Sequence, residues 1–112
     1  TIMSSDPVVR EGASVTVLNG TDSAGLATHW RNQLKLKNFA VVSVGDADTK
    51  IPTTTIIDNS AGKNPLTIKA MQQVFPSGKV TTTSPYTGYT SDIIVVIGAD
   101  KIPAATTTKT TP

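Results

Sequence analysis

The sequence has no cysteine and a single histidine, His29. Without cysteine the chain cannot form disulfides, use a thiolate nucleophile or build cysteine-ligated zinc and iron–sulfur sites. One histidine also excludes the two-histidine motifs that bind metal ions. We therefore expect neither a metal site nor a cofactor.

Charge and long hydrophobic runs are also scarce. Charged residues make up 16% of the chain, and 10 basic against 8 acidic residues leave a net charge of +2. This balance does not suit a protein that binds nucleic acids by neutralising phosphates, so we expect no nucleic-acid partner. No apolar run reaches the roughly 18 residues needed to cross a bilayer, so we do not expect this chain to insert into a membrane.

Threonine and proline gather at the C-terminal end and divide the chain into three parts. Residues 101–112 have almost nothing to bury, so they are expected to form a disordered tail. Residues 1–12 are polar and mixed, and we expect a flexible lead-in followed by one globular domain over residues 13–100. Because the sequence starts at Thr1 without a signal-like segment, we expect it to be a fragment of a longer protein.

Turn residues separate segments with strand periodicity from segments with helical periodicity. Leu26, Trp30 and Leu34 repeat with helical spacing, and Asn64 followed by Pro65 is typical of a helix start. The predicted strands are 14–18, 39–44, 53–57, a short edge strand at 79–83, and 93–97. The predicted helices are 23–37 and a segment that starts at 65 and stops at 76, whose inward side chains are Leu66, Ala70, Met71 and Val74. Because residues 93–97 are apolar on both faces, we expect them in the middle of the sheet.

The element order is β-α-β-β-α-(β)-β. We predict an α/β (α+β) fold, a two-layer sandwich with a mostly antiparallel sheet and two helices on one face. The short connection over residues 46–52 favours antiparallel pairing of the second and third strands, because a parallel pair needs a long crossover. A doubly wound parallel sheet is the alternative.

The turn Asn19-Gly20-Thr21 is the first candidate site. A strand that leads through a glycine turn into a helix exposes amide groups and the positive end of the helix dipole, where anions bind. Neither a P-loop nor a dinucleotide motif is present, and Asp22 would repel a phosphate. The alternative is a capped structural turn, with Gly20 at an unusual φ and Gly25 allowing a close approach of helix and sheet.

Two tyrosines form the second candidate site. Tyr86 and Tyr89 lie in a segment with proline and glycine, and they could stack on a sugar ring; alternatively, one of them packs down and pins the loop. His29 is expected at the surface and Trp30 in the core. Because no nucleophile motif is present, we do not expect an enzyme and predict no catalytic residues.

Five segments form a recognisable set: Val15-Thr16-Val17-Leu18-Asn19-Gly20-Thr21, Gly25-Leu26-Ala27, Phe39-Ala40-Val41-Val42-Ser43-Val44-Gly45-Asp46-Ala47, Thr55-Ile56-Ile57 and Asp92-Ile93-Ile94-Val95-Val96-Ile97-Gly98-Ala99-Asp100. Together they resemble the LytR C-terminal domain family, which follows the catalytic LytR-CpsA-Psr domain in cell-envelope proteins. Two departures occur: Asn38 precedes Phe39 where the family usually has glycine, and Asp46 stands where it tends to have asparagine. We expect Asn38 to preserve the turn, because asparagine tolerates a left-handed helix stop.

The resemblance implies an extracytoplasmic domain of a membrane-anchored bacterial cell-envelope protein. Full-length relatives attach wall polymers to peptidoglycan through a different domain, so no catalytic residue carries over to this chain. It implies a non-catalytic accessory domain whose partner is peptidoglycan, wall polysaccharide or an envelope protein. The predicted binding surface combines Asn19, Gly20 and Thr21 with Tyr86 and Tyr89.

Two alternatives remain open at the level of sequence. One is self-association through Thr81-Thr82-Thr83 or Thr53-Thr54-Thr55, whichever lies at a sheet edge. The other is a phosphate- or nucleotide-binding module that uses the turn Asn19-Gly20-Thr21.

Overall fold

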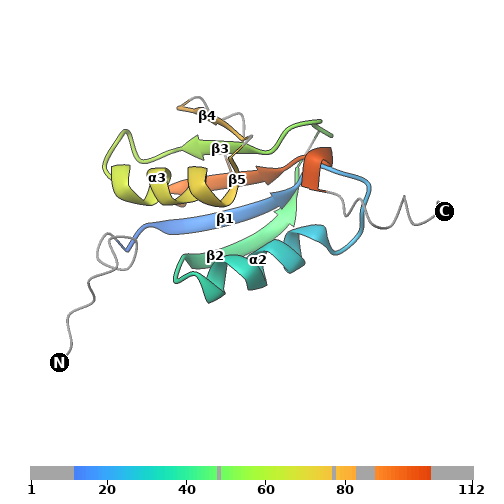
Figure 1. The fold of residues 1–112 in the computed structure, drawn as a ribbon, viewed down its shortest axis with the longest axis horizontal. Helices are drawn as coiled ribbons and strands as arrows, with labels where there is room; N and C mark the ends of the chain where they lie inside the picture. The colour runs from blue at the N-terminus through green and yellow to red at the C-terminus, as the bar shows by residue number, and fades with distance from the viewer. Residues whose placement is uncertain (1–11, 48, 77, 83–87, 102–112) are drawn as a thin grey trace.

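The structure is a computed structural model that describes residues 12–101 apart from 48, 77 and 83–87. Its elements follow the predicted order, including the short strand before the last one (Figure 1). They are β1 (Ser14–Asn19), α2 (Leu26–Leu36), β2 (Ala40–Asp46), β3 (Thr55–Asp58), α3 (Pro65–Val74), β4 (Lys79–Thr81), β5 (Ile93–Ile97) and the 3-10 helix η1 (Ala99–Lys101).

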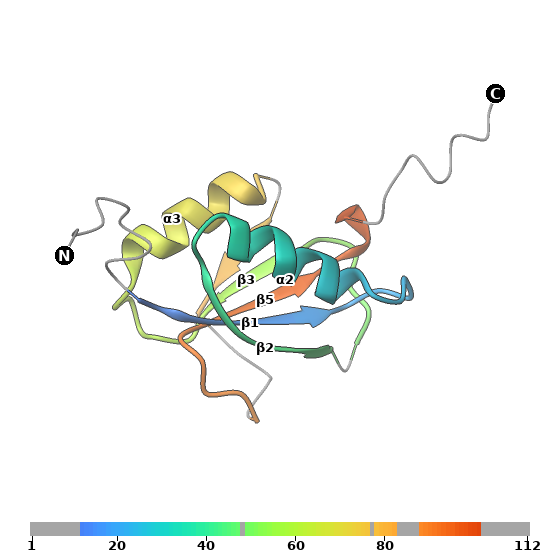
Figure 2. The same cartoon turned by 90° about the horizontal axis from the view of Figure 1, so that it is seen from below.

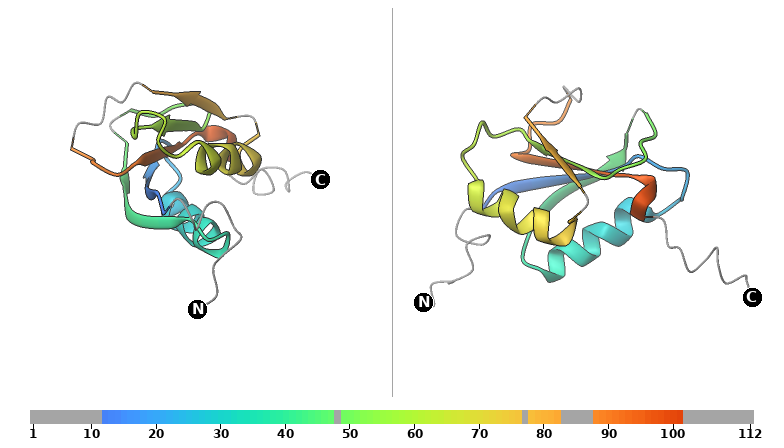
Figure 3. Two further views of the ribbon diagram at one scale, coloured as in Figure 1. Left: turned by 90° about the vertical axis from the view of Figure 1, so that its left-hand side faces the viewer. Right: turned by 45° about the horizontal axis from the view of Figure 1, so that its top comes forward.

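The strands form one sheet in the order β2-β1-β5-β3-β4, and both α-helices cover the same face of it (Figures 2 and 3). The predicted two-layer sandwich with helices on one face is therefore confirmed. The prediction for β5 is also confirmed, because this strand lies third of five and all its residues are buried.

The prediction of a mostly antiparallel sheet is wrong. β1 pairs in parallel with β2 and β5, and β3 pairs in parallel with β4, while β3 and β5 pair antiparallel. The sheet is mixed because each helix is itself the long crossover that a parallel pair requires, α2 between β1 and β2 and α3 between β3 and β4.

The predicted pairing of the second and third strands is also wrong, because β1 and β5 lie between β2 and β3. β3 does run against β2, so the connection only has to pass along one end of the sheet. Backbone hydrogen bonds hold it there: Ala47 donates to Asn19, Ile51 donates to Gly20, and Ala99 donates to Ile51.

The two β-α-β units explain why both helices lie on one face. Such crossovers are right-handed in nearly all proteins. The second unit runs in the opposite direction to the first and steps toward the opposite edge of the sheet. A right-handed turn in each unit therefore places α2 and α3 on the same side, as Figure 2 shows.

Apolar side chains fill both faces of the sheet. The larger cluster lies between sheet and helices and includes Leu34, Met71 and Phe75. A smaller cluster of Leu18, Ile57, Ile94 and Val96 lies on the helix-free face, covered by Ala47, Ile51 and Tyr89.

The inward face of α3 differs from the predicted one at its start. Leu66 is 47% exposed, whereas Thr67 and Met71 are fully buried. Thr67, Met71 and Phe75 are spaced by four residues, so they share one side of the helix. Trp30 is only partly buried and packs at the core boundary, with its ring centroid 4.9 Å from that of Phe75.

Asn38 ends α2 in the left-handed conformation, with φ of 73°. The expectation that asparagine replaces glycine at this turn is confirmed.

We predict that Asn38→Ala lowers the free energy of unfolding by about 1 kcal/mol, because the left-handed backbone conformation is less favourable for alanine than for asparagine. Asn38→Gly is the matched control and should retain full stability in urea denaturation; equal loss in both variants would contradict the conformational explanation.

Candidate functional site

The Asn19 side chain is buried at the end of β1 and is fully engaged in its own turn. Its Oδ1 accepts from the Thr21 amide at 3.0 Å and from the Thr21 hydroxyl at 2.6 Å. Its Nδ2 donates to the Ser23 carbonyl at 2.8 Å, and the Ser23 amide donates to Thr21 Oγ1 at 3.0 Å. The side chain ties the end of β1 to the start of α2.

These contacts leave little of this turn for an anion. The amides of Thr21 and Ser23 already donate to side chains, and the amide of Gly20 donates to the Ile97 carbonyl at 2.9 Å. Anion binding at such turns depends on amides without an internal partner. The geometry therefore favours a structural role over phosphate binding, and we call this set of hydrogen bonds around Asn19 a latch.

Gly20 and Gly25 have the opposite roles to those considered from sequence. Gly25 precedes α2 with φ of 80°, and a Cβ built on it meets nothing within 4 Å. Gly20 is the site of close approach, because a Cβ there would lie 2.8 Å from the Ile97 carbonyl oxygen. Gly25 thus supplies the left-handed conformation, and Gly20 lets β1 and β5 end side by side.

A second latch joins the end of β5 to the connection before β3. Asp100 Oδ1 accepts from the Thr54 amide at 2.9 Å and from its hydroxyl at 2.8 Å. The Gly98 amide donates to Thr54 Oγ1 at 3.0 Å, and Thr54 is completely buried. Gly98 and Asp100 therefore have structural roles in the described chain.

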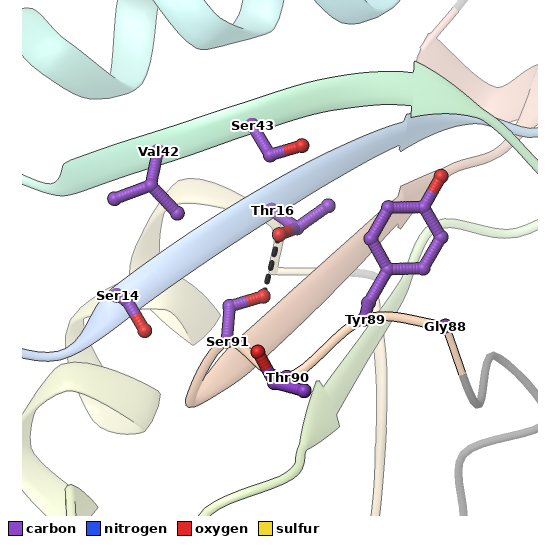
Figure 4. A pocket seen from close by; sticks show the side chains of 8 residues that line it. All are labelled: Ser14, Thr16, Val42, Ser43, Gly88, Tyr89, Thr90 and Ser91. Atoms are coloured by element: carbon purple, nitrogen blue, oxygen red, sulfur yellow. Dashed lines mark hydrogen bonds between the residues drawn. The ribbon is translucent and has the colours of Figure 1, made fainter.

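The helix-free face carries an open groove of about 380 Å³ (Figure 4). Its residues come from β1, β2 and the segment before β5. They are Ser14, Thr16, Val42, Ser43, Gly88, Tyr89, Thr90 and Ser91.

Tyr89 forms one wall of this groove and is partly buried against Leu18 and its neighbours. A Cβ on Gly45 would lie 3.0 Å from the phenol oxygen, so the missing side chain of Gly45 makes room for the ring. Tyr89 thus combines packing with exposure to the groove. Tyr86 lies outside the described residues.

The floor of the groove is held by hydrogen bonds between strands. The hydroxyls of Thr16 and Ser91 bond to each other at 2.5 Å, and the dashed line in Figure 4 marks this contact. The Ser14 amide donates to Asp92 Oδ2 at 3.1 Å, and the Asp92 amide donates to Ser14 Oγ at 2.9 Å. These contacts join β1 to the start of β5.

A β-bulge shapes the opposite wall. Val15 pairs with Val41 and Thr16 pairs with Ser43, so Val42 has no partner on β1. Bulges redirect side chains, and Val42 is 65% exposed beside the groove. An apolar side chain therefore faces solvent in a groove otherwise rich in hydroxyl groups.

Among the described residues, the Asn19 side chain and Tyr89 lie on opposite faces of the sheet. The Asn19 side chain lies on the helix side of the sheet, because it follows Val17 by two residues and pairs with Ile97, and both of these pack under the helices. Tyr89 packs on the helix-free face.

The groove hydroxyls of β1 and β2 are not among the residues that the sequence analysis predicted. Their signal in the sequence is the alternation of Ser14 and Thr16 with buried valines.

His29 and Trp30 are neighbours on α2 and contact each other through their rings. His29 is exposed and lies edge-on to Trp30, and Lys101 Nζ lies 5.7 Å from the Trp30 ring centroid. Among the described residues, no group of three or more histidine, cysteine, aspartate or glutamate side chains could hold a metal ion. In the same part of the chain, no helix has the length and hydrophobicity to cross a bilayer.

Residues 12–100 match the family described as LytR cell envelope-related transcriptional attenuator. Because the match covers most of the chain, the protein belongs to this family, and the resemblance to the LytR C-terminal domain is confirmed. No curated protein matches the chain significantly.

Two solved structures are similar. One is the crystal structure of the soluble domain (residues 71–217) of a conserved hypothetical secreted protein (Rv2700 ortholog) from Mycobacterium marinum. It has a TM-score of 0.65 and 25% identity over 85% of this chain and 64% of that one, so the chain spans less than two thirds of it. The other, the solution structure of the C-terminal domain of RV0431, has a TM-score of 0.53 and 22% identity over 77% of this chain and 71% of that one. This second similarity shows a shared fold alone.

The family is thus cell-envelope-related, and the first of the two neighbours is described as a secreted protein.

Proposed function

We propose that this domain is a non-catalytic accessory module that holds a cell-envelope protein against wall glycan. The observation that carries the proposal is the groove on the helix-free face, where hydroxyl groups and Tyr89 surround an open space of about 380 Å³. Membership of an envelope-related family supports the same location. The parent protein would be membrane-anchored, and its attachment chemistry would belong to another domain.

The size and position of the groove suit such a role. Ligand sites in proteins commonly occupy about 300–1,000 Å³, and this groove lies within that range. Four of the eight lining residues lie on β1 and β2, so the pairing of these strands holds one side of the groove in place. A side that the sheet already holds in place adds little ordering cost when a ligand binds.

Cosedimentation with purified peptidoglycan and with wall polysaccharide tests the proposal. The domain should pellet with at least one of these materials in a saturable manner, and soluble fragments of that material should compete. Binding to envelope proteins with none to either wall material would replace the glycan proposal with a protein-partner role. Failure to bind any of them would refute the accessory binding function.

Self-association is the second candidate, favoured by the two outer strands of the sheet. β2 and β4 form its edges, and Thr81 belongs to β4. Thr55 lies on β3, inside the sheet, so Thr53-Thr54-Thr55 is not an edge segment. Edge strands can pair between chains, so sedimentation equilibrium should detect a dimer at high concentration. A strict monomer would contradict this candidate without affecting glycan binding.

A further inference from the structure

We propose that the Tyr89 groove binds an uncharged pyranose unit and excludes anionic, phosphate-rich polymer. This inference rests on the proposed function and adds the chemical class of the ligand. The Tyr89 ring would contact the apolar face of the sugar, while Ser43 and Thr90 would bond to its hydroxyl groups. Three independent features of the groove lead to this assignment.

The first feature is the charge of the lining. The eight groove residues of the described chain carry no lysine, arginine, aspartate or glutamate. Strong recognition of phosphate or carboxylate uses cationic side chains or free amides, and none of these side chains is cationic. The carboxylate of Asp92 bonds to Ser14, one of the lining residues, and disfavours an anion further.

The second feature is a set of unused hydroxyl groups. The hydroxyls of Ser43, Tyr89 and Thr90 form no hydrogen bond with any residue in the described part of the chain, whereas Thr16 and Ser91 satisfy one another. A hydroxyl both donates and accepts, which matches a ligand whose own polar groups are hydroxyls. Ser43 lies on β2 and Thr90 on the segment before β5, so the groups lie on opposite sides of the groove.

The third feature is the pairing of an aromatic ring with an exposed aliphatic side chain. Tyr89 offers a rigid apolar surface with a polar tip, at low conformational cost. Val42 is displaced by the bulge and adds an apolar contact at the other side of the groove. A pyranose presents C–H groups on its faces and hydroxyls at its rim, so it complements both kinds of surface.

Amide NMR shifts of the isotope-labelled full chain test the assignment. Chitotetraose, an uncharged oligosaccharide, should shift the amides of Ser43 and of residues 88–91, and a glycerol phosphate polymer should not. Tyr89→Leu keeps apolar packing but removes the aromatic ring, so it should weaken binding at least tenfold. Tyr89→Phe keeps the ring and should lose much less, and Leu36→Ala on the exposed side of α2 should bind normally.

The unfolding midpoint of each variant shows that it remains folded. Equal shifts by the phosphate polymer, shifts confined to another surface, or unchanged binding by Tyr89→Leu would overturn the assignment. Cosedimentation with peptidoglycan or wall polysaccharide without any response to chitotetraose would overturn it too, while the proposed function would stand. Absence of binding to all wall materials would refute the proposed function itself.

Discussion

Replacing Gly98 with alanine is expected to lower the free energy of unfolding by about 3 kcal/mol, the upper end of the usual cost of overpacking. A Cβ at this position would lie 2.4 Å from the Thr53 carbonyl carbon and 2.6 Å from the Thr54 amide nitrogen. Both are backbone atoms, so no side-chain rotation relieves the clash. The peptide group between Thr53 and Thr54 would have to move away from the end of β5.

That movement would also break the latch around Thr54. Its buried hydroxyl accepts from the Gly98 amide and donates to Asp100, and both contacts depend on the close approach at Gly98. Buried polar groups that lose their partners add to the cost. The strain and the lost hydrogen bonds therefore act in the same direction.

Urea denaturation followed by Trp30 fluorescence or circular dichroism measures the effect, with two other glycines as controls. A Cβ on Gly88 meets nothing within 4 Å, so Gly88→Ala should change stability by less than about 0.5 kcal/mol. Gly20→Ala should fall between the two, because its closest backbone contact is longer, at 2.8 Å. The same unfolding midpoint for the Gly98 and Gly88 variants would contradict the close approach.

Asn19→Ala is expected to lower the free energy of unfolding by about 2–3 kcal/mol, the cost of leaving buried polar groups without partners. The substitution removes the acceptor of the Thr21 amide and hydroxyl and the donor to the Ser23 carbonyl. Because the side chain is only 6% exposed, solvent replaces these contacts poorly. The loosened turn should also exchange its amide protons faster than in the original protein.

Asn32→Ala is the matched control for this substitution. Asn32 is exposed on α2, and its side chain bonds only to the neighbouring, half-buried Arg31 among the described residues, so its removal should be nearly neutral. Asn19→Asp keeps an acceptor for Thr21 but loses the donor to Ser23, and it should lie between alanine and the original protein. Equal stability of the Asn19 and Asn32 variants would contradict the latch.

The two predictions concern the family-like residues at the ends of β1 and β5 and their role in stabilising the fold. Asn19 joins the end of β1 to the turn before α2, and Gly20 bonds to Ile97 at the end of β5. Gly98 and Asp100 join the end of β5 to the connection before β3. Both motifs lie where the parallel strands β1 and β5 end side by side. Asn19, Gly20, Gly98 and Asp100 thus stabilise one end of the sheet. The proposed ligand groove shares Thr16, Val42 and Ser43 with the family-like segments, and its other lining residues lie outside them.

Much of the fold is determined by the sequence alone. Helical spacing of Leu26 and Leu34, the Asn64-Pro65 start and the five apolar residues of β5 are local signals, and each predicts an element that is present. Asn38 shows the same at a single residue, since a left-handed helix stop selects glycine or asparagine. Local periodicity and backbone preference depend on neighbours along the chain, so they can be read without a structure.

Tertiary structure alone decided which strands pair and where the groove lies. Periodicity records whether a residue is buried, but it does not specify which strand inserts between two others, as β5 does between β1 and β3. Likewise, Thr16 and Ser91 are 75 residues apart and meet only after that insertion. Gly20 and Gly98 are explained in the same way, because a close backbone approach is a long-range contact that leaves no local pattern.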